Sequence, residues 1–192
     1  MLLQRRQILA GLGAIVLAEP AHAQATRAAA LVAAARSQIG RTLHYDARYV
    51  RLPYPGGDLP IERGVCTDVV IRALRVIGID LQREVHEDRR RAASAYPKQW
   101  SSAAPDASID HRRVPNLMVY FARRHHALRE GVTVEPADII AWRLPGGAQH
   151  IGVISDRRVA DRLLVIHNIG DGTQEEDILM IFPRIGHYRI AL

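Results

Sequence analysis

Cys66, the only cysteine in the 192-residue sequence, is the side chain best suited to covalent chemistry. It follows a segment rich in proline and glycine and opens a stretch whose apolar residues recur at helical spacing. A thiol in the first turn of a helix lies near unpaired backbone N–H groups and the positive end of the helix dipole, which favour the thiolate. We therefore expect Cys66 to begin a helix and to be a nucleophile with a lowered pKa. The alternative is a buried, inert cysteine, the commonest environment of a free cysteine.

A thiol nucleophile needs a base within hydrogen-bonding distance and a third group that orients the base. Two of the nine histidines lie in suitable contexts. His150 begins an apolar run after a Pro-Gly-Gly turn, and His167 ends the next apolar run. If the two runs pair as a hairpin, both imidazoles lie side by side near one edge of a sheet. Asn168 is an alternative orienting group, although strand alternation places it on the other face.

A metal site is an alternative use of the histidines. His86-Glu87-Asp88, His111 and the pair His125-His126 supply ligand types, and Cys66 with the two strand histidines could hold zinc. None of these residues has a tight motif spacing such as H-E-x-x-H. The sequence therefore favours a thiol site with no metal and no cofactor.

Several charged or polar residues are candidates for contact with a substrate. Arginine side chains near residue 112 suit the carboxylate groups of an acidic peptide. A carboxylate beside the cysteine also suits the first turn of a helix, which is a structural alternative. The residues that we expect to bind substrate are Asp68, Asp110, His111, Arg112 and Asn168. Solvated surface charge is the alternative for this set.

The elements that must position these residues change in character along the chain. Helices are predicted over residues 25–39, over 66–77, and from Pro115 to Gly131. Short β-type runs separated by Gly, Pro and Asp follow, at 138–142, 151–154, 163–166 and 188–192. Helices followed by antiparallel strands predict an α+β fold, in which the cysteine helix packs on an antiparallel sheet.

The N-terminal residues predict an export signal over 1–23. A short basic region precedes an apolar region at 8–18, and Ala21 and Ala23 supply the small residues of a cleavage site. The paired arginines also fit a twin-arginine signal. Because the apolar region is too short to span a bilayer, we expect cleavage, no stable membrane anchor, and a periplasmic or secreted protein. A buried N-terminal helix is the alternative. Residues 24–192 have the length of a single domain.

Charge and cysteine usage narrow the choice of partner. The net charge of +6 allows an anionic partner. The sequence has no basic run with interleaved aromatic residues, so we expect no nucleic-acid partner. A single cysteine cannot form an internal disulfide, and an exposed thiol without a role is unusual in an oxidising compartment. This favours a thiol kept for chemistry.

Five motifs occur in an order that resembles the NlpC-type branch of papain-like cysteine peptidases, bacterial enzymes that cut the peptide stems of peptidoglycan. The motifs are Tyr54-Pro-Gly-Gly, the Cys66 helix, residues 136–142, His150-Ile-Gly-Val and Val165-Ile-His167. The resemblance implies a papain-like domain over 24–192 with an inserted region at about 83–135. It implies Cys66 as nucleophile, His150 as base and His167 as orienting group. It also implies that Tyr54 and the Cys66 backbone amide hold the oxyanion, and phenol and amide donors suit this role.

Longer stretches resemble an uncharacterised exported bacterial family known by a domain-of-unknown-function number, 1287. These stretches are residues 64–70, 85–88, 109–117, 141–147 and 186–189, and the resemblance extends roughly from residue 41 to the end.

The sequence as a whole predicts an exported cysteine hydrolase that cleaves an amide bond, in a peptidoglycan stem peptide or in another amide substrate. One alternative is a non-catalytic papain-like module that binds cell-wall fragments or a protein partner. Another is a thiol acyl- or peptidyl-transferase, since a thioester accepts amines as well as water.

Overall fold

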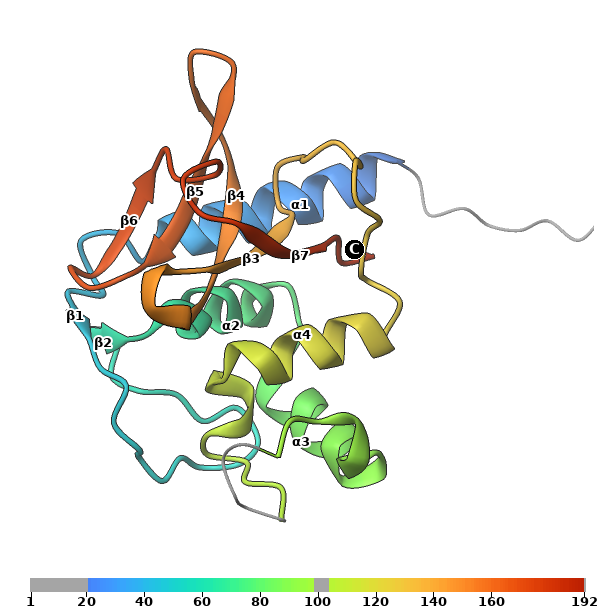
Figure 1. Cartoon of the computed structure of the whole chain (residues 1–192). Coiled ribbons are helices and arrows are strands. Elements are labelled where there is room, and N and C mark those ends of the chain that lie inside the picture. The colour runs from blue at the N-terminus through green and yellow to red at the C-terminus, as the bar shows by residue number, and fades with distance from the viewer. Residues whose placement is uncertain (1–20, 99–103, 192) are drawn as a thin grey trace, which may run out of the picture.

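The computed structural model describes residues 21–98 and 104–191 and shows helices packed against an antiparallel sheet (Figure 1). Of the signal segment predicted over 1–23, residues 1–20 lie outside the described residues, and residues 21–23 belong to the first helix. The α-helices are α1 (Ala21–Arg36), α2 (Cys66–Val76), α3 (Leu81–Arg91) and α4 (Val114–Arg123). Within the described ranges, no helix combines the length and the hydrophobicity that crossing a membrane requires. The predicted α+β class is confirmed.

Five antiparallel strands form the main sheet, in the order β6-β5-β4-β3-β7. They are β3 (Ile139–Arg143), β4 (Gln149–Val159), β5 (Arg162–Asn168), β6 (Thr173–Glu176) and β7 (Arg184–Tyr188). A separate parallel pair joins β1 (His44–Tyr45) to β2 (Arg63–Gly64). The sequence predicted β3, β4 and β5. It placed the last strand at 188–192, whereas β7 covers 184–188, and it did not predict β6.

Helix α2 lies at the centre of the core, and its predicted position is confirmed. Val69, Val70, Ala73 and Leu74 are fully buried where α2 packs against α1, β4 and β5. The helix stops just before Gly78, whose φ of 89° suits glycine at a helix end.

Helix α4 is shorter than the predicted helix that ended at Gly131. It ends at Arg123, since His125 adopts a φ of 60° that breaks the helical path. The chain then runs beside β7, where the Leu128 backbone N–H donates to the His187 carbonyl oxygen at 2.8 Å. Helices α3 and α4 form a layer beside α2 (Figure 1).

Both faces of the main sheet are buried, and alternation along each strand decides which face a side chain occupies. One face packs with α1 and α2 through Ile139, Ala141, Ile151, Val153 and Ile166. The opposite face packs under residues 178–182 through Ile140, Trp142, Ile154, Leu163 and Val165. His150 and His167 have the alternation of this second set, so they point away from α2.

Candidate thiol site

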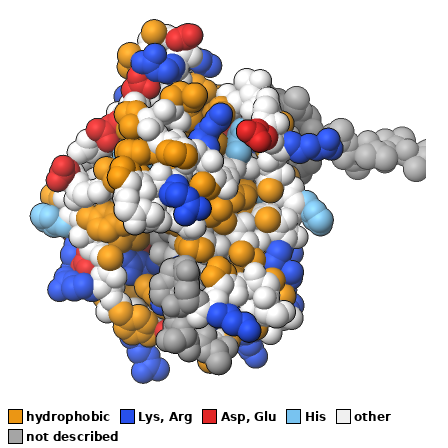
Figure 2. Space-filling view, viewed as in Figure 1, with side chains coloured by type: hydrophobic (Ala, Val, Ile, Leu, Met, Phe, Trp, Pro, Cys, Tyr) orange, Lys and Arg blue, Asp and Glu red, His pale blue; other side chains and the backbone are white. Residues whose placement is uncertain are grey.

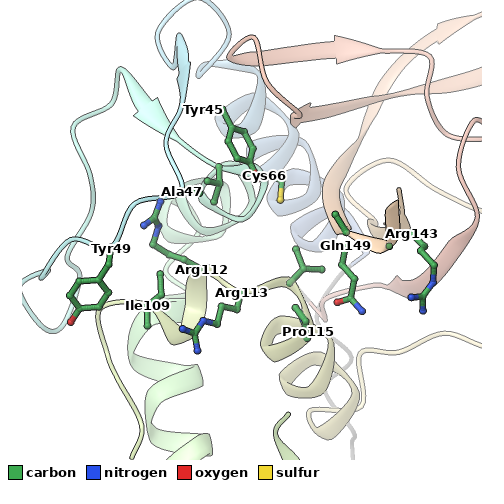
Figure 3. A pocket seen from close by; sticks show the side chains of 14 residues that line it. Tyr45, Ala47, Tyr49, Cys66, Ile109, Arg112, Arg113, Pro115, Arg143 and Gln149 are labelled. Carbon is green, nitrogen blue, oxygen red and sulfur yellow. The ribbon is translucent and has the colours of Figure 1, made fainter. Parts of the chain in front are cut away.

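Cys66 is the first residue of α2, and its side chain lines a pocket of about 620 Å³ (Figure 3). The helix begins there because a carboxylate of the first turn caps it: Asp68 Oδ2 accepts a hydrogen bond from the Val65 backbone N–H at 2.7 Å. Asn168 at the end of β5 donates from Nδ2 to the Gly64 carbonyl oxygen at 3.1 Å. The start of α2 is therefore fixed both from within the helix and from the sheet.

Arg112 holds the same end of α2 from the other side. Its Nε donates to Asp68 Oδ1 at 3.0 Å and its Nη2 to Asp68 Oδ2 at 3.0 Å, in a buried ion pair. The Nη groups also donate to the carbonyl oxygens of Asp46, at 2.9 Å, and Arg48, at 3.3 Å. Because these partners occupy the guanidinium, Arg112 positions α2 and the 46–48 segment. Asp68 and Arg112, both predicted to bind substrate, thus form an ion pair with each other, and Arg112 also lines the pocket.

Tyr45 reaches the sulfur from the β1–β2 pair. The pairing places Tyr45 opposite Gly64, two residues before the cysteine. Its hydroxyl lies beside the Cys66 sulfur, and both side chains line the pocket (Figure 3). Sequence reasoning missed Tyr45, since a two-residue strand leaves no pattern in the sequence.

The Ile151 backbone N–H of β4 also faces the sulfur and favours its ionised form. Along a strand, the backbone N–H groups point alternately to the two neighbouring strands. Those of Ile151 and Val153 therefore both point toward β5. The β4–β5 pairing, however, starts only at Val153 with Ile166. Ile151 thus has no partner on β5 in this pairing, and its backbone N–H faces the sulfur instead.

Burial raises the pKa of the Cys66 thiol to about 11, and the negative charge of Asp68 acts in the same direction. The hydrogen bonds from Ile151 and Tyr45 oppose this shift without reversing it. The predicted lowering by the helix N-terminus is wrong, because removal of the sulfur from water outweighs the favourable dipole. The thiol is consequently protonated at neutral pH.

The two predicted histidines meet directly on the face of the sheet opposite α2. Nε2 of His150 lies 3.0 Å from Nδ1 of His167, and the rings are nearly perpendicular at 84°. Burial lowers the pKa of His150 to about 3, with the charge of His167 adding to the shift. Burial also lowers the pKa of His167. Both imidazoles are therefore neutral, and His150 immediately precedes the residue whose N–H faces the sulfur.

Glu176 on β6 extends this row of side chains, and sequence reasoning missed it too. Its Oε2 lies 3.0 Å from Nε2 of His167. Residues 173–176 are polar throughout, so they lack the apolar alternation by which a strand is recognised.

Three other predicted site residues lie elsewhere. Tyr54 is 45% exposed, and its ring packs edge-on against His86 with centroids 5.1 Å apart. Asp110 is buried in an ion pair with Arg89. His111 is 1% exposed and does not line the pocket. Asn168, the alternative orienting group, binds main-chain atoms of Gly64 and Gly170 instead of an imidazole.

Arginine side chains dominate the charge of the pocket. The described residues that line it include Arg112, Arg113 and Arg143 and no aspartate or glutamate. Arg113 and Arg143 project from opposite sides of the pocket, with Gln149 between Cys66 and Arg143 (Figure 3). On the face seen in Figure 2, Lys and Arg side chains surround the lower half and acidic side chains lie mostly in the upper half. The segment predicted as an insertion, 83–135, contributes Ile109 and residues 112–115 to the lining.

Metal ligands do not gather in the part of the chain that the structure describes. Among these residues, no group of three or more His, Cys, Asp or Glu side chains is arranged to hold an ion.

Together these features define an α+β protein with a buried thiol at a helix start and, on the other face of the sheet, two histidines whose ring nitrogens lie 3.0 Å apart. The chain belongs to the family described as a domain of unknown function, DUF1287, whose model matches residues 32–190. It is also similar to the uncharacterized protein YijF of Escherichia coli (strain K12). The two are 52% identical over 172 residues, which cover 86% of this chain and 83% of that protein. No solved structure matches this chain. The predicted membership of this family is confirmed.

Proposed function

We propose that this protein is an exported thiol hydrolase with a papain-like domain, which cleaves an amide bond in a peptidoglycan stem peptide. The observation that carries the proposal is the position of the Cys66 sulfur. It lines a pocket, next to the strand residue that follows His150. The resemblance to NlpC-type peptidases supports the same assignment of nucleophile and base.

The protonation states favour an attack that is coupled to proton transfer. Cys66 begins as a thiol and His150 as a neutral imidazole. In the proposed reaction, the sulfur bonds to the amide carbonyl carbon while its proton passes to a base, the role that the family resemblance assigns to His150. The C–N bond then breaks as the amine leaves with that proton. Water hydrolyses the thioester with His150 as base, which releases the carboxylic acid and restores the thiol.

Two donors stand ready for the oxyanion of the tetrahedral intermediate. The Cys66 backbone N–H belongs to the first turn of α2, where N–H groups have no partner within the helix. The Tyr45 hydroxyl lies beside the same sulfur. Donors fixed where negative charge develops are an effective source of rate enhancement. Tyr45 thus takes the role that the family resemblance implied for Tyr54.

The charge of the pocket favours an acidic substrate. Arg113 and Arg143 line the same pocket as the thiol, and no acidic side chain belongs to the described lining. Arginine binds carboxylates through paired hydrogen bonds, and stem peptides carry carboxylates next to their amide bonds. A peptide with a carboxylate on each side of the cleaved bond fits this arrangement.

A non-catalytic binding module is the second candidate. The observation that favours it is the raised pKa of Cys66, since a buried protonated thiol is also what an inert cysteine presents. In that case the arginine-lined pocket binds wall fragments without cutting them.

The experiment that separates these functions compares wild type, Cys66→Ala and Cys66→Ser on isolated peptidoglycan, with products read by mass spectrometry. We expect wild type alone to release new fragments, and both variants to keep their affinity for the polymer. Equal fragment release by wild type and Cys66→Ala would refute the hydrolase. Binding by all three proteins without release would support the binding module.

Export is tested separately through the N-terminus of the protein recovered from cells. Signal cleavage after Ala23 predicts a mature chain that begins at Gln24, and a chain that retains residues 1–20 would contradict it.

A further inference from the structure

Three side chains from three neighbouring strands form a row on the sheet face opposite α2. His150 on β4 contacts His167 on β5, and His167 contacts Glu176 on β6. The register explains the row: His167 pairs with Gln174, so Glu176, two residues further along, points to the same face. The His167 side chain is 1% exposed and that of Glu176 is 41% exposed, so the row runs from the interior to the surface.

The distance between the imidazoles requires one shared proton. Two neutral rings with nitrogens 3.0 Å apart are stable only when one nitrogen donates and the other accepts. In the first arrangement, His150 carries its proton on Nε2 and His167 carries its proton on Nε2. In the second, His167 carries its proton on Nδ1, and His150 must then carry its own on Nδ1.

Glu176 distinguishes the two arrangements. A carboxylate only accepts hydrogen bonds. In the first arrangement, the His167 Nε2–H faces the Glu176 oxygen at 3.0 Å; in the second, a bare nitrogen lone pair faces that oxygen and is repelled by it. The separation is that of a hydrogen bond, although the ring N–H does not point straight at Oε2.

We propose that Glu176 is a positioning residue that fixes the tautomers of His167 and His150 and leaves Nδ1 of His150 unprotonated. Under the proposed function, that nitrogen is the one left to act as the base. The inference rests on the proposed hydrolase for the use of the free nitrogen, whereas the tautomers themselves are a property of the three side chains.

The test is the protonation of each imidazole nitrogen, read from long-range ¹H–¹⁵N spectra of the full chain labelled at histidine. At pH 7 we expect wild type to carry the proton on Nε2 of both His150 and His167. Glu176→Gln retains the size of the side chain, but an amide both accepts and donates, so the preference is lost and the Nδ1-protonated form of His150 appears. Glu130→Gln is the matched control, because it removes the same charge from an exposed loop; its spectra match wild type.

The outcomes separate this inference from the proposed function. A proton on Nδ1 of His150 in wild type, or identical spectra for wild type and Glu176→Gln, would overturn the role of Glu176. The expected tautomers in a protein that cuts no wall peptide would refute the hydrolase and leave the role of Glu176 intact. If wild type shows the expected tautomers and also cuts wall peptides, Glu176→Gln should lower kcat by about tenfold or more and leave KM unchanged. Loss of a partner that orients a reacting group typically has an effect of this size.

Discussion

Replacement of Arg112 by methionine tests whether the buried ion pair fixes the start of α2. The Asp68 and Arg112 side chains are 3% and 2% exposed, and two carbonyl oxygens also depend on the guanidinium. Removal of one partner of a buried ion pair leaves a buried charge without compensation and typically costs about 3–5 kcal/mol. We therefore expect Arg112→Met to lower the free energy of unfolding by about that amount.

Urea denaturation followed by circular dichroism measures this loss, with an unchanged dependence on urea concentration. Each kcal/mol corresponds to a fall in Tm of about 2–4 °C for a chain of this size. The control is Arg143→Met, an exposed arginine of the same pocket, which should change stability by less than about 0.5 kcal/mol. The double variant Asp68→Asn with Arg112→Met should lose less than Arg112→Met alone, because no charge remains buried. A loss below about 1 kcal/mol for Arg112→Met would refute the reasoning.

Further predictions concern the role of Tyr45 in catalysis, the pH dependence of stability, and the close packing of Gly152 on β4 against β5. Tyr45→Phe should lower the rate of peptidoglycan cleavage by about 10²-fold, whereas Tyr54→Phe should leave it unchanged; equal effects of the two would contradict the assignment. Burial lowers the folded-state pKa of His150 to about 3, so the unfolded chain gains its proton first. Stability should therefore fall as pH drops below about 6.5, and urea titrations at pH 7, 5.5 and 4.5 measure this loss. Gly152→Ala should destabilise the protein by about 1–3 kcal/mol, because its Cβ would lie 2.7 Å from Val165 Cγ1. Gly170→Ala has open space and should melt as wild type does.

The parts of the site that the sequence predicted depend on long, strongly patterned elements. The apolar spacing after Cys66 predicts α2, and the two apolar runs predict the strands on which His150 and His167 lie. A hairpin between those strands brings the two rings together, because alternation puts both on one face.

The parts that the sequence did not predict depend on burial and on very short pairings. Tyr54 is nearer to Cys66 along the chain than Tyr45 is, yet the β1–β2 pair brings Tyr45 to the sulfur. The raised pKa of Cys66 follows from the packing of the whole core around α2, which no local motif encodes. The sequence also gives no sign that Asp68 and Arg112, both predicted to bind substrate, form a buried ion pair with each other, because they lie 44 positions apart along the chain.

The protonated state of Cys66 also affects how readily its sulfur is oxidised. Peroxides convert thiolates, far more readily than thiols, to sulfenic acid and then to irreversible products. With a pKa of about 11, about one Cys66 side chain in 10⁴ is ionised at pH 7. An environment that oxidises exposed cysteines thus leaves this one reduced, and the sulfur becomes reactive only when a neighbouring base removes its proton.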